Sequence, residues 1–178
     1  MALYLGFLGL VGLQRLGELW LSRRNTRAAL ARGGVEYGRG HFGFMKLLHG
    51  AFLIGCAVEV VALDRPFTPA LGLPMLALAV AAQGLRGWCV RSLGDAWNAR
   101  VVVVPGMRTV TSGPYRHLRH PNYLAVAIEG FAIPLVHGAW ITALVFSAAN
   151  AFLLRTRIRC EEGALAEHAH PGMEEMAT

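Results

Sequence analysis

The stretch from Gly113 to Tyr123 holds the densest set of side chains that could carry chemistry. It reads GPYRHLRHPNY and combines two arginines, two histidines and two tyrosines with two prolines. Arginine pairs with anions, aromatic rings can flank a base such as adenine, and Pro121 suits the first turn of a helix, where free N–H groups can hold a carboxylate. The string therefore indicates a binding site. The alternative is that its Arg, His and Tyr side chains anchor a membrane helix at the headgroup level.

A second polar stretch, RTRIRCEEGAL, covers residues 155–165 and follows an apolar segment. Arg157 and Glu161 are four residues apart, so they share one face of a helix. The adjacent carboxylates of Glu161 and Glu162 need partners or solvent at that position. Two interpretations stay open: a solvated helix end with ion pairs, or a polar wall for a cationic or hydroxyl-bearing ligand.

The elements that must position these residues are apolar and long. The chain of 178 residues is 54% hydrophobic and 16% charged, whereas a soluble domain has about 25% charged residues. A membrane helix needs about 20 apolar residues. Five segments come near that length and cover residues 3–21, 42–63, 70–90, 123–136 and 139–154. The last two segments are joined at His137-Gly138. We predict an all-α integral membrane protein with about five transmembrane helices, of which the last two form a tight hairpin.

The basic residues indicate an orientation. Thirteen of the 17 Lys and Arg residues lie in three regions: 22–41, 91–122 and 155–159. With five crossings all three regions are on one side, which should be cytoplasmic, so the N-terminus is outside and the C-terminus inside. This distribution at segment ends also argues against nucleic acid as the partner, despite a net charge of +6. The start of the chain lacks the basic region of a cleavable signal peptide, so we expect the first segment to be retained.

The stretch 92–122 is the longest between the apolar segments, and Val101–Val104 followed by Pro105-Gly106 reads as a short extended piece and a turn. No repeat or linker divides the chain. We therefore predict one domain over residues 1–178, with N-terminal helices in 1–69 and a core in 70–170. The oligomeric state stays open.

Neither disulfides nor a metal site is expected. The three cysteines are far apart and show no finger spacing. Two histidine pairs, His117/His120 and His168/His170, could each place two ligands, but no carboxylate cluster accompanies them.

Polar residues also lie inside the first apolar segment. Gln14 and Glu18 are four residues apart, and Arg15 lies beside Gln14. Ionisable groups within a membrane usually face the bundle interior or a cavity. Here they form either a structural Arg15–Glu18 pair or part of a functional cavity.

The two polar motifs together resemble the C-terminal core of the isoprenylcysteine carboxyl methyltransferase superfamily, which also contains phospholipid N-methyltransferases. The resemblance covers about residues 85–165 and includes the LRGW and LGDAW segments before the first motif. It implies an S-adenosylmethionine cofactor bound on the cytoplasmic side of the cell membrane. Carried over by position, the implied cofactor contacts are Tyr115, His117, Arg119, His120, Pro121, Tyr123, Glu161 and Glu162, and Arg157 lies near the reaction centre.

The N-terminal part is similar to a bacterial subgroup, found beside type III polyketide synthases, that O-methylates long-chain alkylpyrones or alkylresorcinols. The similarity rests on QRLGEL (residues 14–19), Arg24-Asn25, GVEYG (34–38), His41, Met45 and His49. It implies a phenol or enol acceptor, whose pKa near 10 makes a general base useful. The candidate bases are Glu36, His41, His49 and Glu162, and Arg157 is the candidate to steady the oxyanion.

One departure concerns the end of the chain. Many superfamily members continue after the paired glutamates with an FGxxYxxY-like stretch, whereas this chain reads AEHAHP over residues 166–171. The region that closes over the cofactor must therefore differ. The alternatives are carboxyl methylation of prenylated cysteine, N-methylation of a phospholipid, and a non-enzymatic small transporter or scaffold.

Overall fold

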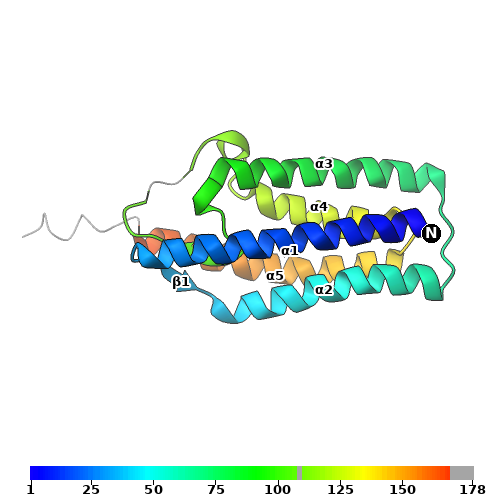
Figure 1. The fold of residues 1–178 in the computed structure, drawn as a ribbon, viewed down its shortest axis with the longest axis horizontal. Coiled ribbons are helices and arrows are strands. Elements are labelled where there is room, and N and C mark those ends of the chain that lie inside the picture. The colour runs from blue at the N-terminus through cyan, green and yellow to red at the C-terminus, as the bar shows by residue number, and fades with distance from the viewer. Residues whose placement is uncertain (108–109, 169–178) are drawn as a thin grey trace, which may run out of the picture.

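Five long helices run along the long axis of the molecule in the computed structural model, which describes residues 1–107 and 110–168 (Figure 1). They are α1 (Ala2–Ala31), α2 (Arg39–Ala62), α3 (Pro69–Leu93), α4 (Pro121–Leu135) and α5 (Trp140–His168). Short 3-10 turns, η1 (Gly94–Ala96) and η2 (Gly113–Arg116), follow α3 and precede α4. Arg108 and His170, which the sequence interpretation counted among the basic and histidine residues, lie outside the described residues, as does the end of the predicted domain.

Three of the five helices have the length and composition to cross a membrane: Arg39–Ala62, Pro69–Ala96 and Trp140–Glu167. Helix α4 has 15 residues, about 22 Å at 1.5 Å per residue, which is less than the hydrocarbon thickness of about 30 Å. Helix α1 is long enough, but it carries Arg15 and Glu18 at its centre. The helical fold is confirmed with three candidate spans, and crossing by all five helices stays a prediction.

The last two helices form the expected hairpin. Helix α4 ends at Leu135 and α5 begins at Trp140, and the Ala139 amide donates to the Pro134 carbonyl oxygen over 2.9 Å within the turn. A residue that the sequence analysis did not consider fixes this turn. The Glu59 carboxylate of α2 accepts the backbone N–H of Ile141 (3.1 Å) and Thr142 (2.7 Å), so it caps the free N-terminus of α5.

A two-stranded antiparallel sheet joins the segment between α1 and α2 to the segment after α3. Strand β1 (Val35–Tyr37) pairs with β2 (Val101–Val103), with Glu36 opposite Val102. The extended piece expected around Val101 is confirmed. Its partner strand β1 was not predicted, because three residues show too little alternation to be recognised.

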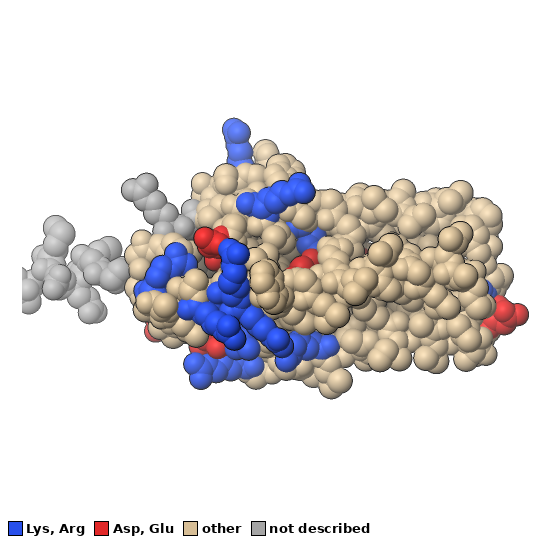
Figure 2. Space-filling model, in the orientation of Figure 1, with Lys and Arg blue, Asp and Glu red and all other residues tan. Residues whose placement is uncertain are grey.

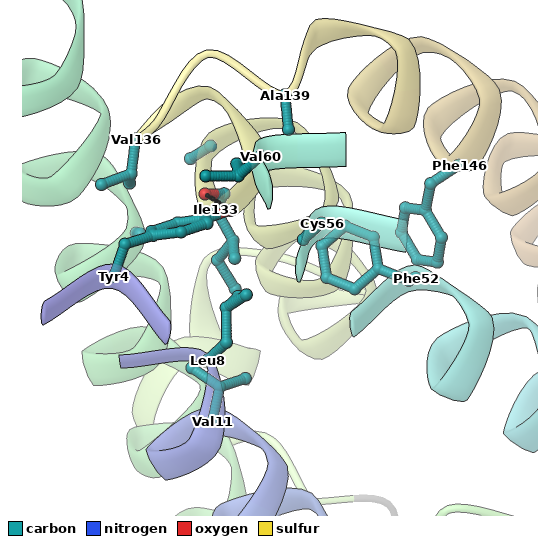
Figure 3. Close-up of a cluster of buried hydrophobic side chains, with 12 residues drawn as sticks. Tyr4, Leu8, Val11, Phe52, Cys56, Val60, Ile133, Val136, Ala139 and Phe146 are labelled. Atoms are coloured by element: carbon teal, nitrogen blue, oxygen red, sulfur yellow. Dashed lines mark hydrogen bonds between the residues drawn. The ribbon is translucent and has the colours of Figure 1, made fainter. Parts of the chain in front are cut away.

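Charge and apolar packing divide the molecule along its length. In Figure 2, Lys and Arg gather toward the end where Figure 1 shows β1, whereas the other end is largely without them. A buried apolar cluster includes Leu8, Val11, Val60 and Ile133 (Figure 3). Within this cluster the Tyr4 hydroxyl donates to the Ile133 carbonyl oxygen over 3.1 Å. The polar motifs of the sequence therefore lie toward the basic end. Which side of a membrane that end faces stays a prediction.

Candidate cofactor and acceptor site

An open cavity of about 1130 Å³ lies between the helices. All five helices, β2 and the segments that flank β2 contribute to its wall. Ligand pockets in proteins usually have 300–1,000 Å³, so this cavity has room for more than one small molecule. It is long rather than round, because on α5 alone it extends from Asn150 to Leu165.

The first motif enters this wall through η2. A Cβ on Gly113 would lie against the Ser92 side chain and 3.0 Å from the Trp88 indole nitrogen, so only glycine allows η2 to approach α3 this closely. The turn presents Tyr115, whose hydroxyl interacts with the Cys89 thiol. Burial raises the pKa of the Tyr115 hydroxyl, which therefore stays protonated and can donate a hydrogen bond.

The two sequence motifs meet where α4 begins. The Tyr123 hydroxyl donates to Glu161 Oε2 over 2.5 Å, and His120 Nε2 lies 3.2 Å from Glu162 Oε1. The rings of His120 and Tyr123 are stacked, with centroids 5.5 Å apart. All four side chains line the cavity. The start of α4 and the end of α5 thus form one wall, although the residues are about 40 positions apart in the sequence.

Arg157 also lines the cavity and is buried, with only 5% of its surface exposed. Its Nη2 donates to the Ala99 carbonyl oxygen over 2.7 Å, and its guanidinium carbon lies 5.9 Å from the centre of the Tyr123 ring. Its buried Nε has no acceptor among the described residues. Trp97 Nε1 and Asn122 Oδ1 are also buried and unpartnered in the described part of the chain, and both residues line the cavity. Such groups suit a ligand rich in donors and acceptors.

Three further residues of the first motif take different positions. Arg119 lines the cavity but is exposed, as expected of a side chain at its rim. His117 is exposed and is not among the lining residues. Pro121 is fully buried at the start of α4, where it shapes the backbone rather than lining the cavity.

The four candidate bases are separated by the fold. Glu162 and His49 line the cavity. Glu36 does not; its carboxylate is bound by Arg100 at 2.7 Å and by Arg39 at 3.4 Å. His41 is also absent from the lining. The His41 ring and the Cys160 thiol both lie close to Gly38, the residue that follows strand β1.

His49 has a defined tautomer. Its Nδ1 lies 2.9 Å from the Met45 carbonyl oxygen, which can only accept, so Nδ1 carries a proton and Nε2 is the ring nitrogen that can act as a base. The ring also packs edge-on against Phe146, with centroids 5.3 Å apart.

The polar residues expected inside the first apolar segment belong to a larger buried network. Arg15 Nη1 donates to Glu18 Oε2 over 2.7 Å, which confirms that they pair. Arg15 Nη2 also reaches Glu129 Oε2 at 2.8 Å, and Arg86 binds Glu129 in bidentate fashion at 3.0 and 2.7 Å. Arg15, Glu18 and Arg86 line the cavity. The sequence analysis missed Glu129, although a carboxylate inside the apolar segment 123–136 was the available signal.

Within residues 1–107 and 110–168, no three His, Cys, Asp or Glu side chains converge as they would around a metal ion. The expectation that the protein lacks a metal site stays a prediction.

These features define a class: a small helical protein with membrane-length helices that line a large open cavity, polar along one wall. Residues 75–167 match the model of the isoprenylcysteine carboxyl methyltransferase (ICMT) family. Since this match covers more than half of the chain, the protein belongs to that family. Membership suggests an S-adenosylmethionine-dependent membrane methyltransferase.

Two bacterial proteins are similar to this chain over most of their length. The uncharacterized protein YpbQ of Bacillus subtilis (strain 168) is 37% identical over 157 residues, which cover 88% of this chain and 92% of the relative. An uncharacterized protein of Haemophilus influenzae (strain ATCC 51907 / DSM 11121 / KW20 / Rd) is 28% identical over 160 residues, covering 88% and 91%. Neither name gives an acceptor.

Proposed function

We propose that this protein transfers a methyl group from S-adenosylmethionine to a lipophilic acceptor within the membrane. The observation that carries the proposal is that side chains of the two motifs contact each other on the cavity wall, in the pairs Tyr123–Glu161 and His120–Glu162. An anchoring role alone gives no reason for these side chains to line a cavity. A transporter or scaffold has no reason to bind S-adenosylmethionine.

The donor set fits this cofactor. Carboxylates such as Glu161 and Glu162 suit an ammonium group or ribose hydroxyls, Arg119 suits a carboxylate, and the stacked His120 and Tyr123 rings offer an aromatic surface. The unpartnered Trp97 and Asn122 atoms supply a further donor and acceptor. When bound, S-adenosylmethionine supplies an electrophilic methyl group on a sulfonium centre.

Arg157 is suited to act on the acceptor. Its contact with Ala99 fixes the guanidinium, and its buried Nε–H, which has no acceptor among the described residues, is a candidate donor for an acceptor oxygen that gains negative charge. A phenol or enol also has to lose its proton. His49 and Glu162 are the two candidate bases on the cavity wall, while the ion pairs of Glu36 favour a structural role for it.

We further propose a long-chain polyketide hydroxyl as the acceptor. The similarity of residues 14–49 to the polyketide-methylating subgroup supports this class. The apolar part of the cavity wall, which includes Leu16, Leu19, Leu53, Leu153 and Leu154, supports a lipophilic tail. The tail would enter sideways from the bilayer, with five helices crossing and the basic end in the cytoplasm. The family name makes carboxyl methylation of prenylated cysteine the second candidate.

Isothermal titration of the detergent-purified protein with S-adenosylhomocysteine tests the cofactor site. We expect micromolar-range binding that His120→Ala and Glu162→Ala each weaken by about tenfold, as the loss of a hydrogen bond to a charged group of about 1.5 kcal/mol implies. His117→Ala is the matched control, because this histidine is exposed and does not line the cavity. Folded wild-type protein that does not bind the ligand would refute the methyltransferase proposal.

A further inference from the structure

Asn150 is a buried polar residue on the cavity wall that the cofactor motifs do not include. It lies on α5 with 2% of its surface exposed, and its Oδ1 is shielded from solvent. No donor among residues 1–107 and 110–168 reaches this oxygen. A buried amide left without a partner is costly, and such an exception in a native protein calls for an explanation.

The position of Asn150 relative to Arg157 gives that explanation. The two residues are seven positions apart on α5, which is two helical turns or about 10 Å along the axis. Leu153 and Leu154 lie between them on the same wall. The cavity therefore has a polar group at the Arg157 level, an apolar stretch, and a second polar group farther along α5.

Other polar residues contribute to the cavity away from the cofactor motifs, and several of them already have partners. Arg15 and Glu18 bind each other and the buried network. His49 Nδ1 is committed to the Met45 carbonyl oxygen. Because Asn150 Oδ1 is covered in the empty cavity, the amide has to turn toward the cavity before a ligand group can complete it, and this turn breaks no ion pair.

We infer that Asn150 is a specificity-determining residue that binds a second hydroxyl group of the lipophilic acceptor, separate from the group that is methylated. A hydroxyl both donates and accepts, so it matches either orientation of the amide. The inference rests on the proposed methyl-transfer function. It narrows the acceptor to molecules with two polar groups, and it disfavours an acceptor that places only a hydrocarbon chain beyond the reaction centre.

The test is a binding cycle between two protein forms and two probes. The probes are 3-pentadecylphenol and an analogue that carries one additional hydroxyl group on the alkyl chain, about 10 Å from the phenol oxygen. Binding is followed by tryptophan fluorescence with S-adenosylhomocysteine present. We expect Asn150→Leu to weaken binding of the chain-hydroxylated probe by about tenfold, the equivalent of one hydrogen bond, and to leave binding of 3-pentadecylphenol within about twofold. Because the cycle compares ratios, differences in detergent partitioning between the probes cancel.

Ser147→Ala is the matched control, since Ser147 Oγ is also buried and unpartnered on α5 within the described residues, but Ser147 does not line the cavity. It should leave both affinities unchanged. Without ligand, Asn150→Leu should raise the Tm, because it replaces an unsatisfied amide with an apolar side chain of similar size.

Equal weakening of both probes by Asn150→Leu, no change in either, or failure of the wild type to bind either probe would overturn the inference. Retained S-adenosylhomocysteine binding in those cases leaves the proposed function intact. If the wild-type protein does not bind S-adenosylhomocysteine, the proposed function is refuted instead. The same probe cycle, carried out without S-adenosylhomocysteine, then still decides whether Asn150 binds the second hydroxyl group.

Discussion

Glu129→Leu tests the buried ion network most directly. The Glu129 carboxylate accepts hydrogen bonds from Arg86 at 3.0 and 2.7 Å and from Arg15 at 2.8 Å. The Arg86 and Glu129 side chains are each 6% exposed, so solvent screens their interaction little. The substitution changes the charge of the four-residue network with Glu18 from zero to +1.

The expected loss of stability is large. Removing one partner of a buried pair leaves an uncompensated charge and typically costs about 3–5 kcal/mol. For a chain of this size that corresponds to a fall in Tm of roughly 6–20 °C. The exposed pair of Arg24 and Asp95, 60% and 74% exposed, serves as the control. Asp95→Asn should cost no more than about 1 kcal/mol.

The assay is thermal unfolding in detergent at one fixed scan rate, since unfolding of such proteins is often irreversible. The double variant Arg86→Met/Glu129→Leu returns the network to zero charge, because Arg15 and Glu18 remain as a pair. It should therefore be more stable than Glu129→Leu alone. A Glu129→Leu protein within 2 °C of wild type, or a double variant whose loss equals the sum of the single losses, would contradict the electrostatic account.

Two further substitutions test the hairpin end of the bundle. Gly72→Ala places a Cβ against the Phe67 ring and 2.6 Å from the Val136 carbonyl oxygen, so it should lower the free energy of unfolding by about 1–3 kcal/mol. The control Gly84→Ala meets nothing within 4 Å and should be neutral or stabilising. Equal melting temperatures of the two variants would contradict the close packing at Gly72. Glu59→Ala removes the acceptor for the first N–H groups of α5 and should cost about 2 kcal/mol in the same assay, with no change in S-adenosylhomocysteine affinity if the cap acts only on the fold.

The sequence predicts the helices well because apolar segments are long and separated by arginines. It also singles out two motifs whose residues line the cavity, since Tyr115–Tyr123 and Arg157–Glu162 concentrate polar groups beside apolar segments. It does not give the pairing between them. That Tyr123 meets Glu161 depends on the turn angle of the α4–α5 hairpin, which no local pattern specifies.

Isolated polar residues inside apolar segments were the harder problem. Glu129 and Asn150 each have apolar neighbours in the sequence, so neither forms a motif. The role of Glu129 follows from its contact with Arg86, 43 positions away in the sequence. The role proposed for Asn150 follows from the lack of a partner for its Oδ1 among the described residues. For the same reason the sequence does not show that Glu36 pairs with Arg100, which lies 64 positions away.

Helix α1 explains how a cavity of this size persists inside a small bundle. In lipid, apolar contact between helices gives little net attraction, so polar contacts and close packing hold helices together. Near its C-terminal end α1 is fixed to the loop after α3: Asn25 donates to the Trp97 carbonyl oxygen over 2.8 Å, and Ser22 Oγ accepts the Ala99 amide over 3.0 Å. The carbonyl oxygen of the same Ala99 orients Arg157. Trp97, Ala99 and Arg157 line the cavity, whereas Ser22 and Asn25 do not, so α1 holds the loop and the arginine in place without these two side chains filling the cavity.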